Sequence, residues 1–465
     1  MQSSPSSTTH APHSGLQRGL GTAGALGANI IDMVGVGPFI TLPLIVAAMG
    51  GPQAMLGWML GAVLALCDGC TWSELGTAHP EAGGSYAYLK HSFPPKWGKA
   101  FSFLYAWQLL FSAPLSIASG CIGFAQYLSW FFPHMSHAVQ SAVAMCACLA
   151  CTALLFQPVR KLGVATRILG VAVLATLAAV IAIGFTHFSA KLAFSFPAGA
   201  FHIDGAFLIG LGSGLLISAY DYWGYYNVCF LGGEVRNPER TIPRAVLGSI
   251  AIVGTLYLAM NVAVLGVLPW QSLATEDAGA RQYTIAVFTQ TAFASHGWAH
   301  MAASAAVVLI ALASIASVFA LLFGYSRIPF AAAQDGNFPA VFGKLHAKHR
   351  VPTVALLTLC GVTLLCCLLR LQEVIASLVV VRIVFQFLLQ GVAVMLPKHR
   401  KERQKEGRFR MPLYPLPTIA AMCGFVYILA SRPKLLVELR PVTFVLISGL
   451  LIYGLRVWRQ RTVHS

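Results

Sequence analysis

Twelve apolar stretches, each long enough to cross a lipid bilayer, constrain this chain more than any other feature of its sequence. A transmembrane helix needs about 20 apolar residues to span a hydrocarbon core roughly 30 Å thick. Only 10% of the residues are charged, against roughly 25% in soluble proteins. We therefore predict an all-α polytopic membrane protein with 12 transmembrane helices. The predicted spans are residues 20–48, 53–77, 98–130, 138–156, 166–187, 205–231, 244–269, 296–326, 351–370, 373–396, 413–430 and 442–459.

The distribution of lysine and arginine predicts how these spans are oriented. With the N-terminus in the cytoplasm, 24 of the 31 basic residues fall in cytoplasmic segments and six fall in outer loops. Because cytoplasmic loops are enriched in basic residues, we predict a multi-pass plasma membrane protein with both termini cytoplasmic. Arg432 and Arg440 lie on the less favoured side, which makes the last two spans the least secure. The net charge of +16 follows this topology, so we do not expect a nucleic-acid partner.

The first span contains a break at mid-membrane depth. Residues 29–43 read NIIDMVGVGPFITLP. Gly35 and Gly37 are poor helix formers, and Pro38 lacks an N–H and suits the first turn of a new helix. Asp32 lies just before the break. Unpaired backbone at this depth is tolerated only where it lines a cavity or meets a ligand. The alternative is a proline kink packed against neighbouring helices.

The sixth span carries a second interruption. Asp221 and Gly224 lie among five aromatic residues within residues 210–231. The two interrupted spans are five apart, an odd number, so the halves that contain them run in opposite orientations. Broken helices at matching places in inverted halves are the sequence signature of a secondary transporter's central site. We predict inverted repeats over about residues 20–187 and 205–396.

Buried charges provide candidates for a charge network. At 1.5 Å per residue, Asp32 lies roughly 18 Å from the cytoplasmic end of its span, and Arg382 lies roughly 14 Å from the outer end of its own. These depths nearly coincide, and a buried arginine usually has a carboxylate partner. We predict that Arg382 pairs with Asp32 or Asp221, directly or through water. Asp68 in the second span is a further candidate for proton coupling.

Four segments resemble the amino acid–polyamine–organocation (APC) superfamily of permeases, and they occur in that family's order. They are GVGPF at residues 35–39, SELGTAHPEAGGSYAYLKHSF at 73–93, GGEVRNPERTIPRA at 232–245 and the segment from SRIPF to VALL at 326–357. The resemblance implies a 5+5 inverted repeat with broken helices 1 and 6 and two additional C-terminal helices. It also implies a secondary active amino acid transporter, a symporter or antiporter, that works by alternating access.

The resemblance also implies where the substrate binds. Its carboxylate would meet N–H groups at the restart of the first span, because a helix start offers free donors and partial positive charge. Its ammonium would meet carbonyl groups at the two breaks. Tyr220 is the candidate aromatic lid, with Trp223 second. The substrate-binding candidates are Ile31, Asp32, Gly35, Val36, Gly37, Tyr220, Asp221 and Trp223.

The sequence leaves the coupling mechanism open between proton, sodium and counter-substrate. Span five contains no lysine between residues 167 and 187, where some proton-coupled relatives carry one. Ser314 and Ser317 lie one turn apart in span eight and are a candidate sodium site, although such pairs are more often packing contacts. The cysteine pairs lack nearby histidines, so we expect no bound metal, and we expect no cofactor.

The predicted organisation has four parts. Residues 1–17 form a disordered cytosolic tail, 18–396 the transporter core, 397–412 a basic cytosolic loop, and 413–465 two C-terminal transmembrane helices with a short tail. The expected partners are the bilayer and a small amino acid or a polyamine. The alternatives are a transporter of polyamines or other organocations, favoured if both aspartates are free, and a non-transporting amino acid sensor. We do not expect an enzyme, because no nucleophile or nucleotide-binding motif is present.

Overall fold

The computed structural model describes residue 16 and residues 18–157, 159–274, 282–369, 371–433 and 435–464. The described residues are predominantly helical and contain no β-strand. Eight of the described helices are long and apolar enough to cross a membrane, and a bent pair, α1 and α2, makes a ninth. The chain is therefore a multi-pass helical membrane protein. Sixteen of the 17 residues in the predicted N-terminal tail lie outside the described part.

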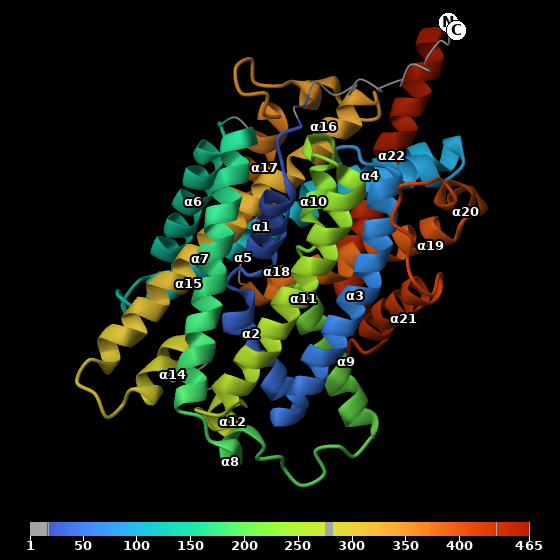
Figure 1. Cartoon of the computed structure of the whole chain (residues 1–465). Helices are drawn as coiled ribbons and strands as arrows, with labels where there is room; N and C mark the ends of the chain where they lie inside the picture. Colours follow the sequence, from blue (N-terminus) through green and yellow to red (C-terminus); the bar gives the residue numbers. More distant parts are fainter. Residues whose placement is uncertain are drawn as a thin grey trace, which may run out of the picture.

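The helices follow the predicted spans closely, and Figure 1 shows that most of them run roughly parallel to one long axis of the molecule. In chain order they are α1 (Thr22–Met33), α2 (Gly37–Met49), α3 (Met55–Ala78), α4 (Ser85–Ser92), α5 (Pro95–Leu128), α6 (His137–Leu154), α7 (Val159–Thr186), α8 (Ala190–Ala193), α9 (Gly205–Tyr222), α10 (Asn227–Phe230), α11 (Pro238–Leu265), α12 (Trp270–Ala274), α14 (Thr284–Ala292), α15 (Ala299–Tyr325), α16 (Arg327–Gln334), α17 (Thr353–Cys366), α18 (Leu371–Arg382), the π-helix η4 (Ile383–Leu388), α19 (Leu389–Met395), α20 (Pro397–Arg403), α21 (Leu416–Ala430) and α22 (Leu435–His464).

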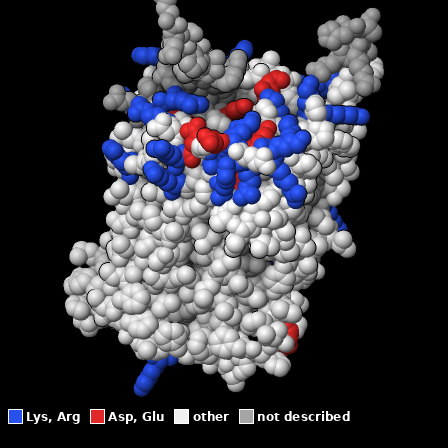
Figure 2. Space-filling view, turned by 45° about the vertical axis from the view of Figure 1, so that its right-hand side comes forward, with Lys and Arg blue, Asp and Glu red and all other residues white. Residues whose placement is uncertain are grey.

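The exposed sides of several helices carry large apolar side chains, as a lipid-facing surface requires. Val171 on α7, Leu312 on α15 and Leu451 on α22 are 64%, 59% and 63% exposed. A soluble monomer rarely exposes such a continuous apolar surface. In the space-filling view of Figure 2, the middle of the molecule is almost free of charge. The apolar surface and the lengths of the helices therefore both indicate that the chain lies in a bilayer.

Charged side chains gather at one end of the molecule. Figure 2 shows lysine, arginine, aspartate and glutamate crowded there, while the opposite end of the same face carries few. Residues 18–21, directly before α1, and the C-terminal end of α22 also lie at the crowded end (Figure 1). This is the end at which we predict the cytoplasm. The orientation itself stays a prediction.

Three predicted spans are less regular than the sequence pattern indicates. Helix α17 has 14 residues and α21 has 15, fewer than the roughly 20 that span a bilayer without tilt. The sixth predicted span is a helix of 18 residues, α9, followed by a single turn, α10. Twelve crossings and the inverted repeat therefore stay predictions.

Candidate functional site

The first helix break lies between α1 and α2, which bend by 44° across it. Helix α1 closes with a hydrogen bond from the Val34 N–H to the Ile30 carbonyl, at 2.8 Å. Within the described chain, the N–H groups of Gly35, Val36 and Gly37 donate no backbone hydrogen bond across the break. Helix α2 then begins at Gly37, with Pro38 in its first turn. The break therefore presents N–H groups at the positive end of a 13-residue helix.

The second break lies between α9 and α10 and contacts the first directly. Gly224 has a φ angle of +119°, which side-chain-bearing residues rarely adopt. A Cβ atom on Gly224 would lie 2.6 Å from the Met33 nitrogen and 2.7 Å from the Asp32 carbonyl carbon. Only glycine permits this approach. The two interruptions predicted from the sequence are therefore present, and they meet.

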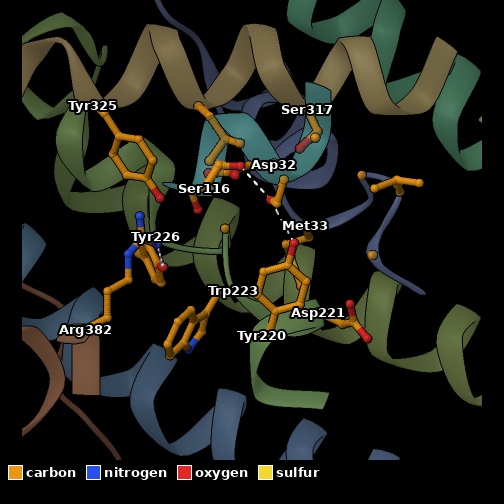
Figure 3. Close-up of a pocket in the computed structure, with 17 residues that line it drawn as sticks. Asp32, Met33, Ser116, Tyr220, Asp221, Trp223, Tyr226, Ser317, Tyr325 and Arg382 are labelled. Atoms are coloured by element: carbon orange, nitrogen blue, oxygen red, sulfur yellow. Dashed lines mark hydrogen bonds between the residues drawn. The ribbon is translucent and has the colours of Figure 1, made fainter. Parts of the chain in front are cut away.

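A cavity of about 40 Å³ lies where the breaks meet. It is bordered by α1, α2, α5, α9, α15 and α18, and Figure 3 shows its side chains converging from these elements. Its lining residues are Asp32, Met33, Gly35, Val36, Gly37, Ser116, Ser119, Gly120, Tyr220, Asp221, Trp223, Gly224, Tyr226, Ser317, Leu321, Tyr325 and Arg382. Such a volume holds a few water molecules, so a ligand that fits without rearrangement is small.

Asp32 lines the cavity at the junction of three helices. Its Oδ2 atom accepts a hydrogen bond from Asn227 Nδ2 at 2.8 Å. The same amide nitrogen donates to the Ala320 carbonyl on α15 at 3.0 Å. Asn227 therefore holds the carboxylate in place and joins α1 to the second break.

Asp221, near the C-terminal end of α9, also lines the cavity, and its carboxylate lies beside the start of α2. Thr41 donates a hydrogen bond to its Oδ2 atom, while Oδ1 is buried without a partner among the described residues. A Cβ atom on Gly37 would collide with this carboxylate. Asp68 lies outside the lining, where its Oδ2 atom accepts from Tyr225 at 2.6 Å.

Arg382 reaches the cavity from the end of α18 and is 1% exposed. Its Nη1 atom donates to Tyr226 Oη at 3.2 Å. Its guanidinium carbon lies 4.9 Å from the ring centre of Tyr325 and 5.8 Å from that of Trp223. No described carboxylate lies within 4.0 Å of it, so the direct ion pair expected with Asp32 or Asp221 is absent from the described residues. Aromatic faces and a hydroxyl group surround the cation instead.

The two predicted lid residues both line the cavity. Tyr220 is half-buried and donates from its hydroxyl to Ser119 Oγ on α5, at 2.9 Å. Trp223 is 6% exposed and stacks on Phe387 with ring centres 4.9 Å apart. Tyr220 is hydrogen-bonded to α5 across the cavity, whereas Trp223 packs against η4 and beside Arg382 on α18, so the hydrogen bond favours Tyr220 as the lid.

Two other candidates are placed differently from the prediction. Ile31 is fully buried and does not border the cavity, because α1 continues for two residues beyond it. Ser317 borders the cavity, whereas the Ser314 hydroxyl donates to the Ile310 carbonyl in its own helix at 3.0 Å. The structure therefore does not bring the two serines together on the cavity wall. A sodium site formed by both stays a prediction without this support.

Several residues of the site are not predicted from the sequence. Ser116 and Ser119 on α5, and Tyr325 at the end of α15, carry no local signal beyond a serine-rich apolar helix and a helix end. Tyr226 lines the cavity and Asn227 binds Asp32 from outside the lining. Both lie in the predicted second interruption, where a polar asparagine in an apolar segment is the available signal. Their roles depend on which distant helices pack beside them.

Buried contacts join three segments that lie toward the charged end of the molecule (Figure 1). Glu234 and Arg327 form an ion pair with both side chains 0% exposed, and their Oε1 and Nε atoms are 3.0 Å apart. The N–H groups of Gly19 and Leu20 both donate to the Glu234 carbonyl at 2.9 Å. Deeper in the molecule, Trp72 stacks on Tyr226 with ring centres 4.6 Å apart. These contacts join the N-terminal segment, the loop after α10 and the start of α16.

A polar cluster joins the end of α3, and His79 directly after it, to the basic segment 397–412. The carboxylate of Glu74 contacts His399 Nε2 at 3.1 Å and Arg403 Nε at 2.9 Å. Next to it, His79 Nε2 lies 3.2 Å from Glu402 Oε2. Burial lowers the pKa of His79. The adjacent His79 imidazole lowers the pKa of Glu402 to about 2. The cluster therefore holds an ionised glutamate at neutral pH.

Comparison with known proteins gives one family. The sequence profile described as "Amino acid permease" matches residues 20–448. The chain is 27% identical to the serine/threonine exchanger SteT of Bacillus subtilis over 430 residues, which cover 91% of this chain and 92% of SteT. It is 28% identical to the human Asc-type amino acid transporter 1, covering 75% of this chain and 65% of that protein. It is 24% identical to the branched-chain amino acid permease BcaP of Lactococcus lactis, covering 85% and 86%.

Proposed function

Because the chain belongs to the amino acid permease family, we propose that it is a secondary active amino acid transporter working by alternating access. The observation that carries this proposal is the contact between two helix breaks around a small polar cavity. Gly224 packs against the backbone of Asp32 and Met33. This contact joins the two breaks. Broken helices that supply free N–H and carbonyl groups are the usual construction of such a site.

The two ends of an amino acid match the two kinds of group at the breaks. The carboxylate is placed at the N–H groups of Gly35, Val36 and Gly37, where the α2 dipole favours negative charge. The ammonium group is placed at Asp32, whose carboxylate Asn227 holds toward the cavity. Tyr220 closes over the ligand. The twelve crossings and the 5+5 inverted repeat belong to this proposal, with α1–α2 and α9–α10 as the matching broken spans.

Alternating access requires contacts that break when the cavity opens to one side. The Glu234–Arg327 ion pair and the backbone hydrogen bonds from Gly19 and Leu20 occupy the cytoplasmic side in the proposed orientation. The contact between Tyr220 and Ser119 occupies the other side. We assign the first group to the inner gate and the second to the outer gate.

The cavity favours an amino acid over a polyamine. Asp32 and Asp221 would attract a polycation, but the guanidinium of Arg382 lines the same cavity and would repel it. The known relatives named as transporters of serine, threonine or branched-chain amino acids support the same choice. Coupling is assigned to protons or counter-substrate rather than to a sodium site at Ser314 and Ser317. A sensor without transport activity is the second candidate, and it shares the same site.

Purified protein in liposomes tests this proposal. We expect uptake of at least one labelled amino acid from a panel that includes serine, leucine, lysine and the polyamine putrescine, measured with and without a pH gradient or internal amino acid. Binding of an amino acid without any flux would identify a sensor. Uptake of putrescine alone would overturn the amino acid assignment.

A further inference from the structure

We propose that Arg382 is the residue that selects the substrate, by donating hydrogen bonds to an oxygen atom in the substrate's side chain. The class of substrate is a small amino acid with a side-chain oxygen, of which serine and threonine are the simplest members. The inference rests on the proposed transport function, which does not itself depend on Arg382.

Arg382 is a buried cation, and two of its N–H-bearing nitrogen atoms have no hydrogen-bond acceptor among the described residues. Its Nη1 atom is bonded to Tyr226, but Nε and Nη2 are buried and have no hydrogen-bond partner among the described residues. Buried donors without partners are costly, particularly on a charged group. A ligand oxygen near the guanidinium would remove that cost. An arginine with only a structural role would instead be expected to form an ion pair with a neighbouring carboxylate.

Arg382 lies at one end of the cavity, away from the start of α2. Figure 3 shows Arg382 and Asp221 on opposite sides of the group of lining side chains, with Trp223 and Tyr220 between them. Asp221 marks the start of α2, where the substrate carboxylate is placed. Arg382 therefore lies at the end of the cavity that the substrate's side chain would reach.

The local backbone supports a functional role for this position. Arg382 is the last residue of α18, and the π-helix η4 begins at the next residue, Ile383. π-Helical turns inside α-helices are rare and are often found at functional sites. The extra residue in this turn changes the direction of the side chains that precede and follow it.

Size and polarity narrow the class of side chain. A cavity of about 40 Å³ excludes large side chains unless the protein rearranges, and the guanidinium disfavours cationic ones. Tyr226 and Tyr325 place two further hydroxyl groups beside Arg382, and Ser116 adds a third on the cavity wall. A hydroxyl group of the substrate could accept from Arg382 and donate to one of these. An apolar side chain would leave the guanidinium unpartnered.

Isosteric pairs of amino acids test the proposal in the wild-type protein. Threonine and valine have nearly the same shape, and serine and alanine differ by one oxygen. A hydrogen bond from a charged donor corresponds to a roughly ten- to hundredfold preference. We therefore expect threonine to bind at least tenfold more tightly than valine, and serine more tightly than alanine, in competition with a labelled substrate in liposomes. Equal binding within both pairs would overturn the proposal.

Variants then test whether Arg382 causes the preference. Arg382→Met removes the donors at similar volume, and the threonine preference should fall to within about threefold of valine. Arg382→Lys keeps the charge but loses the planar fork, so an intermediate preference is expected. Arg440→Met, at an exposed position on α22, is the matched control. A preserved preference in Arg382→Met would overturn the proposal.

Two outcomes separate this inference from the proposed function. If no amino acid binds or is transported by the wild-type protein, the transport function fails. If amino acids are transported without preference for a side-chain oxygen, only the role of Arg382 fails. If Arg382→Met does not fold, the wild-type pairs and Arg382→Lys decide, with substrate-induced shifts in unfolding temperature as the readout.

Discussion

The ion pair between Glu234 and Arg327 offers the sharpest test of the inner gate. Both side chains are fully buried, and two nitrogen–oxygen pairs lie 3.0 and 3.5 Å apart. Removing one partner of a buried pair leaves an uncompensated charge and costs about 3–5 kcal/mol. If the pair separates on opening, Glu234→Gln or Arg327→Met destabilises only the closed gate. The open form should then become at least about a hundredfold more populated.

Hydrogen exchange measures this population directly. The amide hydrogens of Gly19 and Leu20 are bonded to the Glu234 carbonyl, so their exchange requires the gate to open. We expect their exchange, followed by mass spectrometry, to accelerate at least about a hundredfold in either single variant. The double variant lacks both charges and should exchange more slowly than either single one.

A matched control uses an ion pair outside the gate. Arg432 and Glu438 are paired but partly exposed, and partly exposed pairs contribute little to stability. Glu438→Gln should leave the exchange of Gly19 and Leu20 unchanged. Unchanged exchange in both single gate variants, or a double variant with fully additive effects, would refute the reasoning.

Three further predictions follow from the site and its surroundings. Gly224→Ala places a Cβ atom against Met33 and forces a strained φ angle, so we expect a loss of about 2–4 kcal/mol in stability and no measurable uptake; normal uptake would show that the breaks do not meet. Asp32→Asn removes the charge placed at the substrate ammonium, and at least a tenfold loss of affinity with intact expression is expected; unchanged affinity would remove Asp32 from the site. Because the pKa of Glu402 is lowered, its ionised form stabilises the packing of segment 397–412 at pH values above the ordinary glutamate pKa of 4.5. This stabilisation is lost as the pH falls from 4.5 toward 2. The difference in unfolding temperature between the wild type and Glu402→Gln should therefore shrink over that range, and a difference that is constant with pH would contradict the assignment.

The helices and both breaks could be predicted because their causes are local. Long apolar segments must be helical in lipid, since every backbone group needs a partner there. Gly35, Gly37 and Pro38 interrupt one helix, and Gly224 interrupts another. These residue types act through their own backbone preferences, which a single sequence displays.

The partners of the site residues could not be predicted, because they depend on packing between distant helices. Depth along the spans suggested a carboxylate for Arg382, but depth does not fix which face of a helix a side chain occupies. The structure surrounds Arg382 with Tyr226, Tyr325 and Trp223 instead. Asn227 likewise reaches Asp32 only because α10 packs beside α1.

An experimental structure of the protein with a transported amino acid bound tests the central claim most directly. We expect ligand density between the two breaks, with the carboxylate within hydrogen-bond distance of the Val36 and Gly37 N–H groups and the amino group beside Asp32. Ligand density elsewhere, with this cavity still filled by protein side chains or water, would contradict it.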